Sequence, residues 1–87
     1  MTMEQSEIVE MTNDVFEESF EIERDRLVPD AHVFNDLGLD SLDTVDLIVA
    51  LQQKFGVRIR QDERIREIRT LKDIYDFVGA LKAEGDA

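Results

Sequence analysis

The sequence predicts an all-α fold: a small four-helix bundle with a long loop between helices 1 and 2 and a short third helix. Three observations carry this prediction. The first part of the 87-residue chain repeats its apolar residues at helical spacing. Two later segments start or end on typical helix-capping residues. No alternating apolar and polar run is long enough for a sheet.

The first predicted helix covers Ile8 to Ile22. Its apolar face, on about one half of a helical wheel, holds Ile8, Val9, Met11, Thr12, Val15, Phe16, Ser19, Phe20 and Ile22. The other half holds Glu10, Asn13, Asp14, Glu17, Glu18 and Glu21. This separation is typical of an amphipathic helix that packs one face on a core.

A long loop should follow, from Glu23 to about Asp40, since this stretch is polar and contains Pro29. Gly38 marks a turn within it. Four apolar residues should anchor the loop to the core: Val33, Phe34, Leu37 and Leu39.

The second helix is expected over Leu42–Phe55. Asp40 and Ser41 are suitable N-cap residues, and Gly56 can end the helix in the left-handed conformation. Val57–Ile59 is expected to be extended.

Two helices are expected in the remaining chain. Asp62–Ile68 can form only a short one. Thr70 and Asp73 offer a capping box for a last helix that reaches about Leu81. The chain is therefore predicted to be one domain, residues 1–87, with its helical core at about 8–81.

Charge and composition limit the function. There are 21 acidic and 10 basic residues, which give a net charge of −11, and 14 of the acidic residues lie before Leu47. This charge argues against binding nucleic acid or an anionic membrane and favours basic partners. The chain has no Cys, no signal-peptide pattern and no apolar run long enough to span a membrane. We therefore expect a cytoplasmic protein that borrows any thiol it uses. We also expect it to be a monomer.

The second helix carries two apolar stripes. Leu47, Ile48, Leu51 and Phe55 form an ordinary core stripe. Leu42, Val45 and Val49 form another, roughly opposite, with Asp43 and Asp46 beside it. One interpretation is a central helix that is packed on both sides. The other is an exposed apolar strip with an acidic border, on which a partner rimmed by Lys or Arg docks.

Ser41 stands at the start of this helix, directly after Asp40. Both residues can be simple caps, which is the usual meaning of such a pair. A hydroxyl at a helix N-terminus is also a suitable phosphate anchor, because backbone N–H groups and the positive end of the helix dipole face the anion.

The segment Asp36-Leu37-Gly38-Leu39-Asp40-Ser41-Leu42-Asp43-Thr44-Val45 resembles the prosthetic-group attachment motif of acyl carrier proteins. The resemblance extends from about Ile8 to Leu81. It implies that a phosphopantetheinyl transferase loads Ser41 with 4′-phosphopantetheine from coenzyme A, and that the thiol of this arm carries acyl groups as thioesters. The chain would then be a carrier with no catalytic activity of its own.

The same resemblance implies roles for other residues. Asp40 would help to position the metal and phosphate during loading. Acyl-processing enzymes such as ketosynthases and acyltransferases would recognise Leu42, Asp43, Val45, Asp46 and Val49. The cavity that shelters the acyl chain would be lined or bordered by Leu47, Leu51, Phe55, Ile59, Ile68 and Leu71, which would part to admit it.

Some residues depart from carriers of fatty-acid synthesis. Gln52, Gln53 and Lys54 stand where that group usually has acidic residues. Five arginines follow: Arg58, Arg60, Arg64, Arg66 and Arg69. These departures leave open whether the carrier serves fatty-acid biosynthesis or a specialised pathway with polyketide or aminoacyl cargo. An unmodified acidic helical adaptor is the alternative outside the family.

Other kinds of site find little support. Asp36, Asp40 and Asp43 lack the spacing of a calcium-binding loop, so no resident metal is expected. His32 has no partners for a catalytic triad, and a local hydrogen bond is its expected role.

Overall fold

Three α-helices and a short 3-10 helix form the regular structure of the computed structural model, which describes residues 4–59 and 67–85. They are α1 (Gln5–Phe20), η1 (Arg24–Arg26), α2 (Ser41–Phe55) and α3 (Leu71–Gly85). Within these residues the all-α prediction is confirmed. The four-helix detail is not: most of the predicted short helix, Asp62–Ile68, lies outside the described residues, and three α-helices are seen in the rest.

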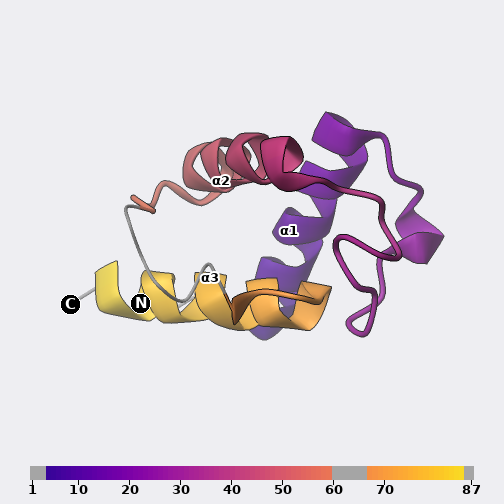
Figure 1. The fold of residues 1–87 in the computed structure, drawn as a ribbon. Helices are drawn as coiled ribbons and strands as arrows, with labels where there is room; N and C mark the ends of the chain where they lie inside the picture. The colour runs from indigo at the N-terminus through magenta and orange to yellow at the C-terminus, as the bar shows by residue number, and fades with distance from the viewer. Residues whose placement is uncertain (1–3, 60–66, 86–87) are drawn as a thin grey trace.

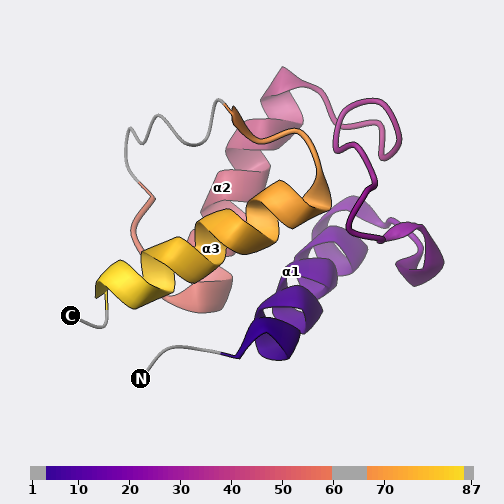
Figure 2. The same cartoon turned by 90° about the horizontal axis from the view of Figure 1, so that it is seen from below.

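The helix α1 connects the other two. It packs against both α2 and α3, and in Figure 1 it runs between α2 above and α3 below. Figure 2, seen from below, shows α3 in front of α2 with α1 beside them. The loop between α1 and α2 gathers at the start of α2, on the side away from both chain ends. The start of α2 is thus held by the loop.

The buried face of α1 explains its length. Ile8, Thr12, Val15 and Phe16 follow helical spacing and are buried. The helix ends at Phe20, and Glu21 adopts the left-handed conformation with φ 55°. It therefore begins before Ile8 and ends before Ile22, but Ile22 is still buried just beyond it.

Asn13 was placed on the polar half of α1, and that prediction is wrong. Its side chain is buried, and the Tyr75 hydroxyl donates a hydrogen bond of 2.6 Å to Asn13 Oδ1. A wheel drawn from residue types places every Asn outside. A phenol on a facing helix supplies the hydrogen-bond partner that allows this one inside.

The loop before α2 is joined to the start of α3 by backbone hydrogen bonds. The Val33 N–H donates to Arg69 O (2.8 Å), and the Leu71 N–H donates to Ala31 O (3.1 Å). His32 and Thr70 form an isolated antiparallel bridge. The predicted anchors Val33, Leu37 and Leu39 are buried, and Phe34 packs against the core. These contacts hold the loop that leads to Ser41.

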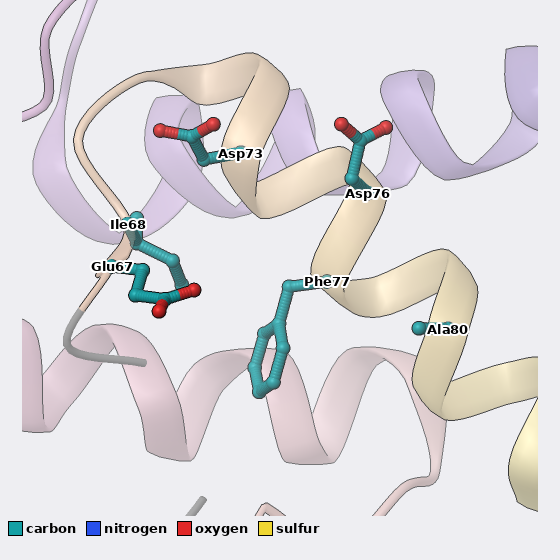
Figure 3. A pocket seen from close by; sticks show the side chains of 6 residues that line it. All are labelled: Glu67, Ile68, Asp73, Asp76, Phe77 and Ala80. Atoms are coloured by element: carbon teal, nitrogen blue, oxygen red, sulfur yellow. The ribbon is translucent and has the colours of Figure 1, made fainter. Parts of the chain in front are cut away.

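The start of α3 is the predicted capping box. Asp73 Oδ2 accepts hydrogen bonds from the Arg69 N–H (2.9 Å) and the Thr70 N–H (3.1 Å), and Thr70 Oγ1 accepts one from the Asp73 N–H (3.3 Å). The two backbone donors hold the pKa of Asp73 below its ordinary value. Figure 3 shows Asp73 in the first turn, and Phe77 one turn later pointing towards α2. The helix continues past Leu81 to Gly85, through residues that favour helix.

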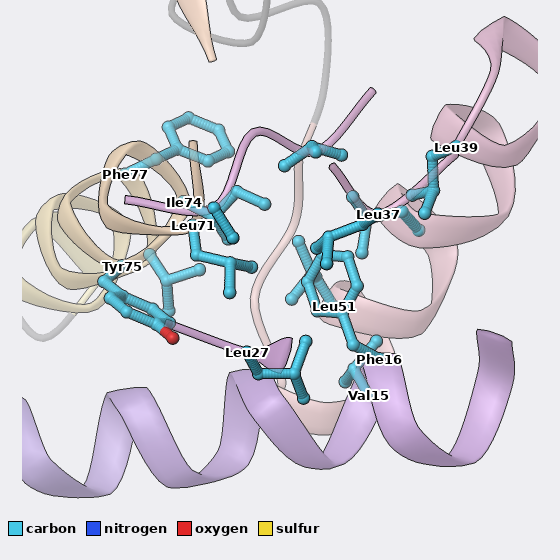
Figure 4. Packing of buried hydrophobic residues seen from close by; sticks show 14 of the residues in the cluster. Val15, Phe16, Leu27, Leu37, Leu39, Leu51, Leu71, Ile74, Tyr75 and Phe77 are labelled. Atoms are coloured by element: carbon cyan, nitrogen blue, oxygen red, sulfur yellow. The ribbon is translucent and has the colours of Figure 1, made fainter. Parts of the chain in front are cut away.

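One apolar core joins all these elements. Figure 4 shows side chains of α1, α2, α3 and the loop meeting in it, with Phe16, Leu51 and Ile74 among them. Phe16, Leu71, Ile74 and Val78 are completely excluded from solvent. This core fixes the inner face of α2 and leaves its outer face to other uses.

Candidate functional site

The start of α2 is shaped by a complete capping box. Asp40 Oδ1 accepts hydrogen bonds of 2.9 Å from the N–H groups of Leu42 and Asp43, and Asp43 Oδ2 accepts one of 3.1 Å from the Asp40 N–H. Gly38, with φ 77°, makes the turn that brings the chain to Asp40. The N-cap prediction for Asp40 is confirmed, and Ser41 is the first residue of the helix.

Ser41 is exposed, and its hydroxyl makes no hydrogen bond to any of the described residues. Leu42, its neighbour, is 78% exposed. Asp40 takes up the helix-capping role, so the serine is not needed as a cap. A bulky group on Ser41 Oγ can extend into solvent without displacing a core residue.

The first turn of α2 offers a phosphate fewer free backbone N–H groups than the sequence predicts. Those of Leu42 and Asp43 already donate to the Asp40 carboxylate. The first-turn amide left for an anion is that of Ser41 itself. With two carboxylates beside it, a phosphate on Ser41 is favoured by exposure and the helix dipole more than by a cradle of amides.

The outer stripe of α2 is exposed. Leu42 is 78% exposed, Val45 60% and Val49 45%, the largest exposures of large apolar residues in the described chain except for Val28. Asp46 is exposed beside them and Asp43 is partly buried. The interpretation of α2 as a helix packed on both sides is therefore wrong.

The inner stripe of α2 faces the core, with Leu47, Leu51 and Phe55 buried and Ile48 half-buried, and it borders a cavity of about 30 Å³. Six residues were expected to line or border an acyl-chain cavity, and three of them, Leu47, Leu51 and Ile68, line this one. Phe55, Ile59 and Leu71 are buried in the core but are not lining residues. The cavity is also lined by six residues for which that role was not predicted: Val33, Phe34, Thr44, Ile48, Ile74 and Phe77.

The sequence holds a partial indication of the additional lining residues. Ile74 and Phe77 are three apart on α3, and Thr44, Leu47, Ile48 and Leu51 follow helical spacing on α2. Spacing alone identifies a buried face, but it does not tell which part of that face borders a void. The cavity has about the volume of one water molecule in the liquid. An acyl chain of the kind that the resemblance implies would therefore have to separate core side chains to enter it.

Gln52 and Lys54 have local structural roles. Gln52 Oε1 accepts a hydrogen bond of 2.8 Å from the Ile59 N–H, which fixes the chain after α2. Lys54 Nζ lies 3.8 Å from Asp14 Oδ2 on α1. Gln53 alone of the three is exposed. Lys54 is thus turned towards α1.

The basic segment is described only in part. Arg58 is exposed, and Arg69 Nη1 donates to Ile68 O (2.9 Å). Arg60, Arg64 and Arg66 lie outside the described residues. His32 Nδ1 accepts from the N–H groups of Phe34 (3.2 Å) and Asn35 (3.1 Å), which confirms its local hydrogen-bonding role.

The described residues contain neither a cluster of metal ligands nor a membrane-spanning helix. Among residues 4–59 and 67–85, three or more His, Cys, Asp or Glu side chains nowhere come together as metal ligands would. None of the helices in this part of the chain combines the length and apolar character needed to cross a membrane.

Comparison with known proteins identifies relatives over nearly the whole chain. A family model described as a phosphopantetheine attachment site matches residues 13–78, a span that includes Ser41. Acyl carrier protein 2 of Ralstonia nicotianae is 41% identical over 81 residues, which cover 93% of this chain and 99% of the relative. The acyl carrier protein of Thermosynechococcus vestitus is 40% identical over 76 residues, which cover 87% and 93%.

Proposed function

The chain belongs to the acyl carrier proteins with a phosphopantetheine attachment site, and from this we propose that Ser41 carries the 4′-phosphopantetheine arm. The family consists of carriers that other enzymes act on, and not of enzymes. The observation that carries the assignment to Ser41 is its position: an exposed hydroxyl at the first residue of α2, freed from capping by Asp40.

Loading would proceed by a phosphoryl-group transfer. Ser41 Oγ attacks the phosphorus atom of coenzyme A that bears pantetheine, and the new P–O bond replaces the pyrophosphate bond. Adenosine 3′,5′-bisphosphate leaves, and a base of the transferase takes the hydroxyl proton. The bound arm supplies a terminal thiol that holds acyl groups as thioesters. Asp40 Oδ1 holds the first turn of α2 in place through its two hydrogen bonds. Asp40 Oδ2 accepts no hydrogen bond from any of the described residues.

The outer strip of α2, Leu42, Val45 and Val49 with Asp43 and Asp46, is proposed as the surface on which partner enzymes dock. Its exposure supports this role. A soluble protein seldom leaves three neighbouring large apolar side chains in water on one helix face without a use for them. The acidic border favours partners with Lys or Arg around an apolar groove, which suits ketosynthases, acyltransferases and the loading transferase.

We place the protein in the cytoplasm as a monomer that serves fatty-acid biosynthesis. The names of the relatives specify a carrier and no pathway. Gln53 and Arg58, exposed near the end of α2, support the alternative of a specialised pathway with polyketide or aminoacyl cargo.

Mass spectrometry tests the proposed attachment site. Incubation with coenzyme A, Mg²⁺ and a broad phosphopantetheinyl transferase should add one phosphopantetheine per chain to the wild type. Ser41→Ala should gain none and should stay folded, because Asp40 keeps its capping hydrogen bonds. Ser19→Ala, a change of an exposed serine on α1, is the matched control and should be loaded like the wild type. A loaded Ser41→Ala protein would overturn the assignment.

A further inference from the structure

Two hollows of the molecule share a wall. The inner cavity, about 30 Å³, lies behind α2 and is lined by Thr44, Leu47 and Leu51 among others. An open groove of about 190 Å³ lies along α3 and is lined by Glu67, Ile68, Asp73, Asp76, Phe77 and Ala80. Ile68 and Phe77 border both. In Figure 3 the Phe77 ring extends from α3 towards α2, between Ile68 and Ala80.

The inner cavity is connected to Ser41 by helix geometry. Thr44 lies three residues after Ser41, so the two side chains are neighbours on the surface of α2. Thr44 lines the cavity, and Leu47, Ile48 and Leu51 continue the same side of the helix inward. A chain that enters beside Thr44 is guided along this row towards Phe77.

The shared wall is the part of the cavity that moves at least cost. A densely packed core resists expansion, because each displaced side chain must displace another. Ile74 is fully buried and lines the inner cavity alone of the two hollows, whereas Phe77 and Ile68 also line the open groove. Rotation of Phe77 would therefore join two volumes that already exist, the inner cavity and the groove.

We propose that Phe77, with Ile68, is a movable partition that sets which acyl groups this carrier shelters: short chains stay in the inner cavity, and long chains with an uncharged end pass into the groove beside Ala80. The proposal deepens the carrier function and rests on it. The partition acts as a specificity determinant, since it decides how far a chain can be buried.

The groove selects for an uncharged chain end. It is lined by the apolar side chains of Ile68, Phe77 and Ala80 and also by three carboxylate residues, Glu67, Asp73 and Asp76. Asp73 remains ionised, because the backbone N–H groups of Arg69 and Thr70 stabilise the anion. Asp76 and Glu67 are exposed. An acyl chain that ends in a carboxylate would meet these carboxylates in a partly desolvated site, which is unfavourable.

The test uses the full chain loaded on Ser41 with saturated acyl groups from butanoyl to hexadecanoyl. Ala80→Leu fills the groove without touching the inner cavity, and Ala83→Leu, on the exposed side of α3, is the matched control. We expect the melting temperature of the wild type to rise with chain length. In Ala80→Leu, long acyl chains should no longer raise the melting temperature further, whereas short chains should raise it as in the wild type. Ala83→Leu should behave like the wild type with every chain.

Nuclear Overhauser contacts locate the chain directly. The terminal methyl group of a long chain should contact the Ala80 methyl group, and that of butanoyl should contact Leu47 or Leu51. Phe77→Leu, which retains an apolar side chain, should let shorter chains reach Ala80. A long chain that ends in a carboxylate should give no contact with Ala80 and a smaller rise in melting temperature than its methyl-ended analogue.

Failures of the two proposals differ. If no acyl chain can be loaded on Ser41, mass spectrometry shows it and the carrier assignment to Ser41 fails, together with the partition. If loading succeeds but long chains never contact Ala80, or Ala80→Leu leaves every melting temperature increment unchanged, the partition alone is refuted.

Discussion

The two faces of α2 have similar side chains and opposite surroundings. On the inner face, Leu47, Leu51 and Phe55 are buried against α1, α3 and the loop. On the outer face, Leu42, Val45 and Val49 remain in contact with solvent. Since both faces are apolar, hydrophobicity alone does not assign their roles. What decides is whether another part of the chain covers the face.

This difference separates stability from recognition within one helix. An inner side chain contributes to folding through the surface it removes from water, about 25 cal/mol per Å². The apolar surface of an outer side chain is removed from water only when a partner binds, so it stabilises the complex and not the fold. The outer face is therefore free to serve docking, and changes there should affect binding and spare folding.

The largest expected effect on the free energy of unfolding comes from a change on the inner face of α2. Leu51→Ala should lower the free energy of unfolding by ~2–5 kcal/mol, because it removes a buried side chain next to an existing cavity. Val49→Ala, two residues away on the outer face, should lower it by less than about 1 kcal/mol. Urea denaturation of both variants measures the difference. Equal losses would mean that the two faces are equally important to the fold.

A buried polar contact sharpens the comparison. If coverage decides importance, then the hydroxyl of Tyr75 should matter more to folding than the apolar Val49. Tyr75→Phe leaves the buried Asn13 Oδ1 without its 2.6 Å donor, and should cost about 1–3 kcal/mol in the same urea experiment. A loss no larger than that of Val49→Ala would contradict this reasoning.

The same residue gives a pH dependence. Burial raises the pKa of Tyr75 above its ordinary value of 10.0, since the anion is poorly solvated there. Because the pKa of Tyr75 is higher in the folded chain than in the unfolded chain, the neutral hydroxyl contributes fully to the free energy of unfolding below pH 10. This contribution is lost as the pH rises through the folded pKa. Stability should fall on the alkaline side, and less so in Tyr75→Phe. The chain has one Tyr and no Trp, so tyrosinate absorbance reports this group alone.

Much of the fold could be predicted from local chemistry. Asp40, Gly56, Thr70 and Asp73 mark helix ends because caps depend on a few adjacent residues. Asn13 could not be predicted, because its burial depends on Tyr75, 62 residues along the chain. The boundaries of α1 and α3 were displaced by a few residues, since propensity changes gradually there.

The candidate site could be predicted to a similar degree. The exposure of Leu42, Val45 and Val49 was one of two interpretations that the second apolar stripe allowed, and only the packed positions of the other elements decide between them. The cavity was half missed, because Val33 and Phe34 reach it from a loop that has no periodicity to reveal its inner face. The contacts of Gln52 with Ile59 and of Lys54 with Asp14 could not be predicted, because they depend on where the fold places those partners.

Charges on α1 and α2 extend the comparison of covered and uncovered surfaces. Arg24 lies within 3.1 Å of carboxylate oxygens of Glu10, Asp14 and Glu17, which share one face of α1. Asp40, Asp43 and Asp46 at the start of α2 pair with no Lys or Arg in the described part of the chain. Repulsion is thus relieved on α1 and remains on α2, where a basic partner can relieve it.

Arg24→Gln should restore the repulsion among Glu10, Asp14 and Glu17, because it removes the cation that lies between them. The melting temperature should fall by less than in Tyr75→Phe, because exposed ion pairs contribute little individually. It should also rise more steeply with NaCl than in the wild type, since salt screens the exposed carboxylates. Arg58→Gln makes the same charge change at an exposed residue and serves as the control. Identical salt dependence in the two variants would show that Arg24 has no special role.

The smallest expected effect concerns the rate of docking. Gln53 is the exposed member of the non-acidic group at the end of α2, so it can be changed without disturbing the Gln52 or Lys54 contacts. Gln53→Glu should raise the association rate with a ketosynthase that has a basic docking patch, by less than ~10-fold at low salt. Stopped-flow measurements should show the gain disappear as salt is added. Gln5→Glu adds the same charge at the start of α1 and should change the rate less. Equal gains in both variants would mean that net charge, and not the outer face of α2, steers the encounter.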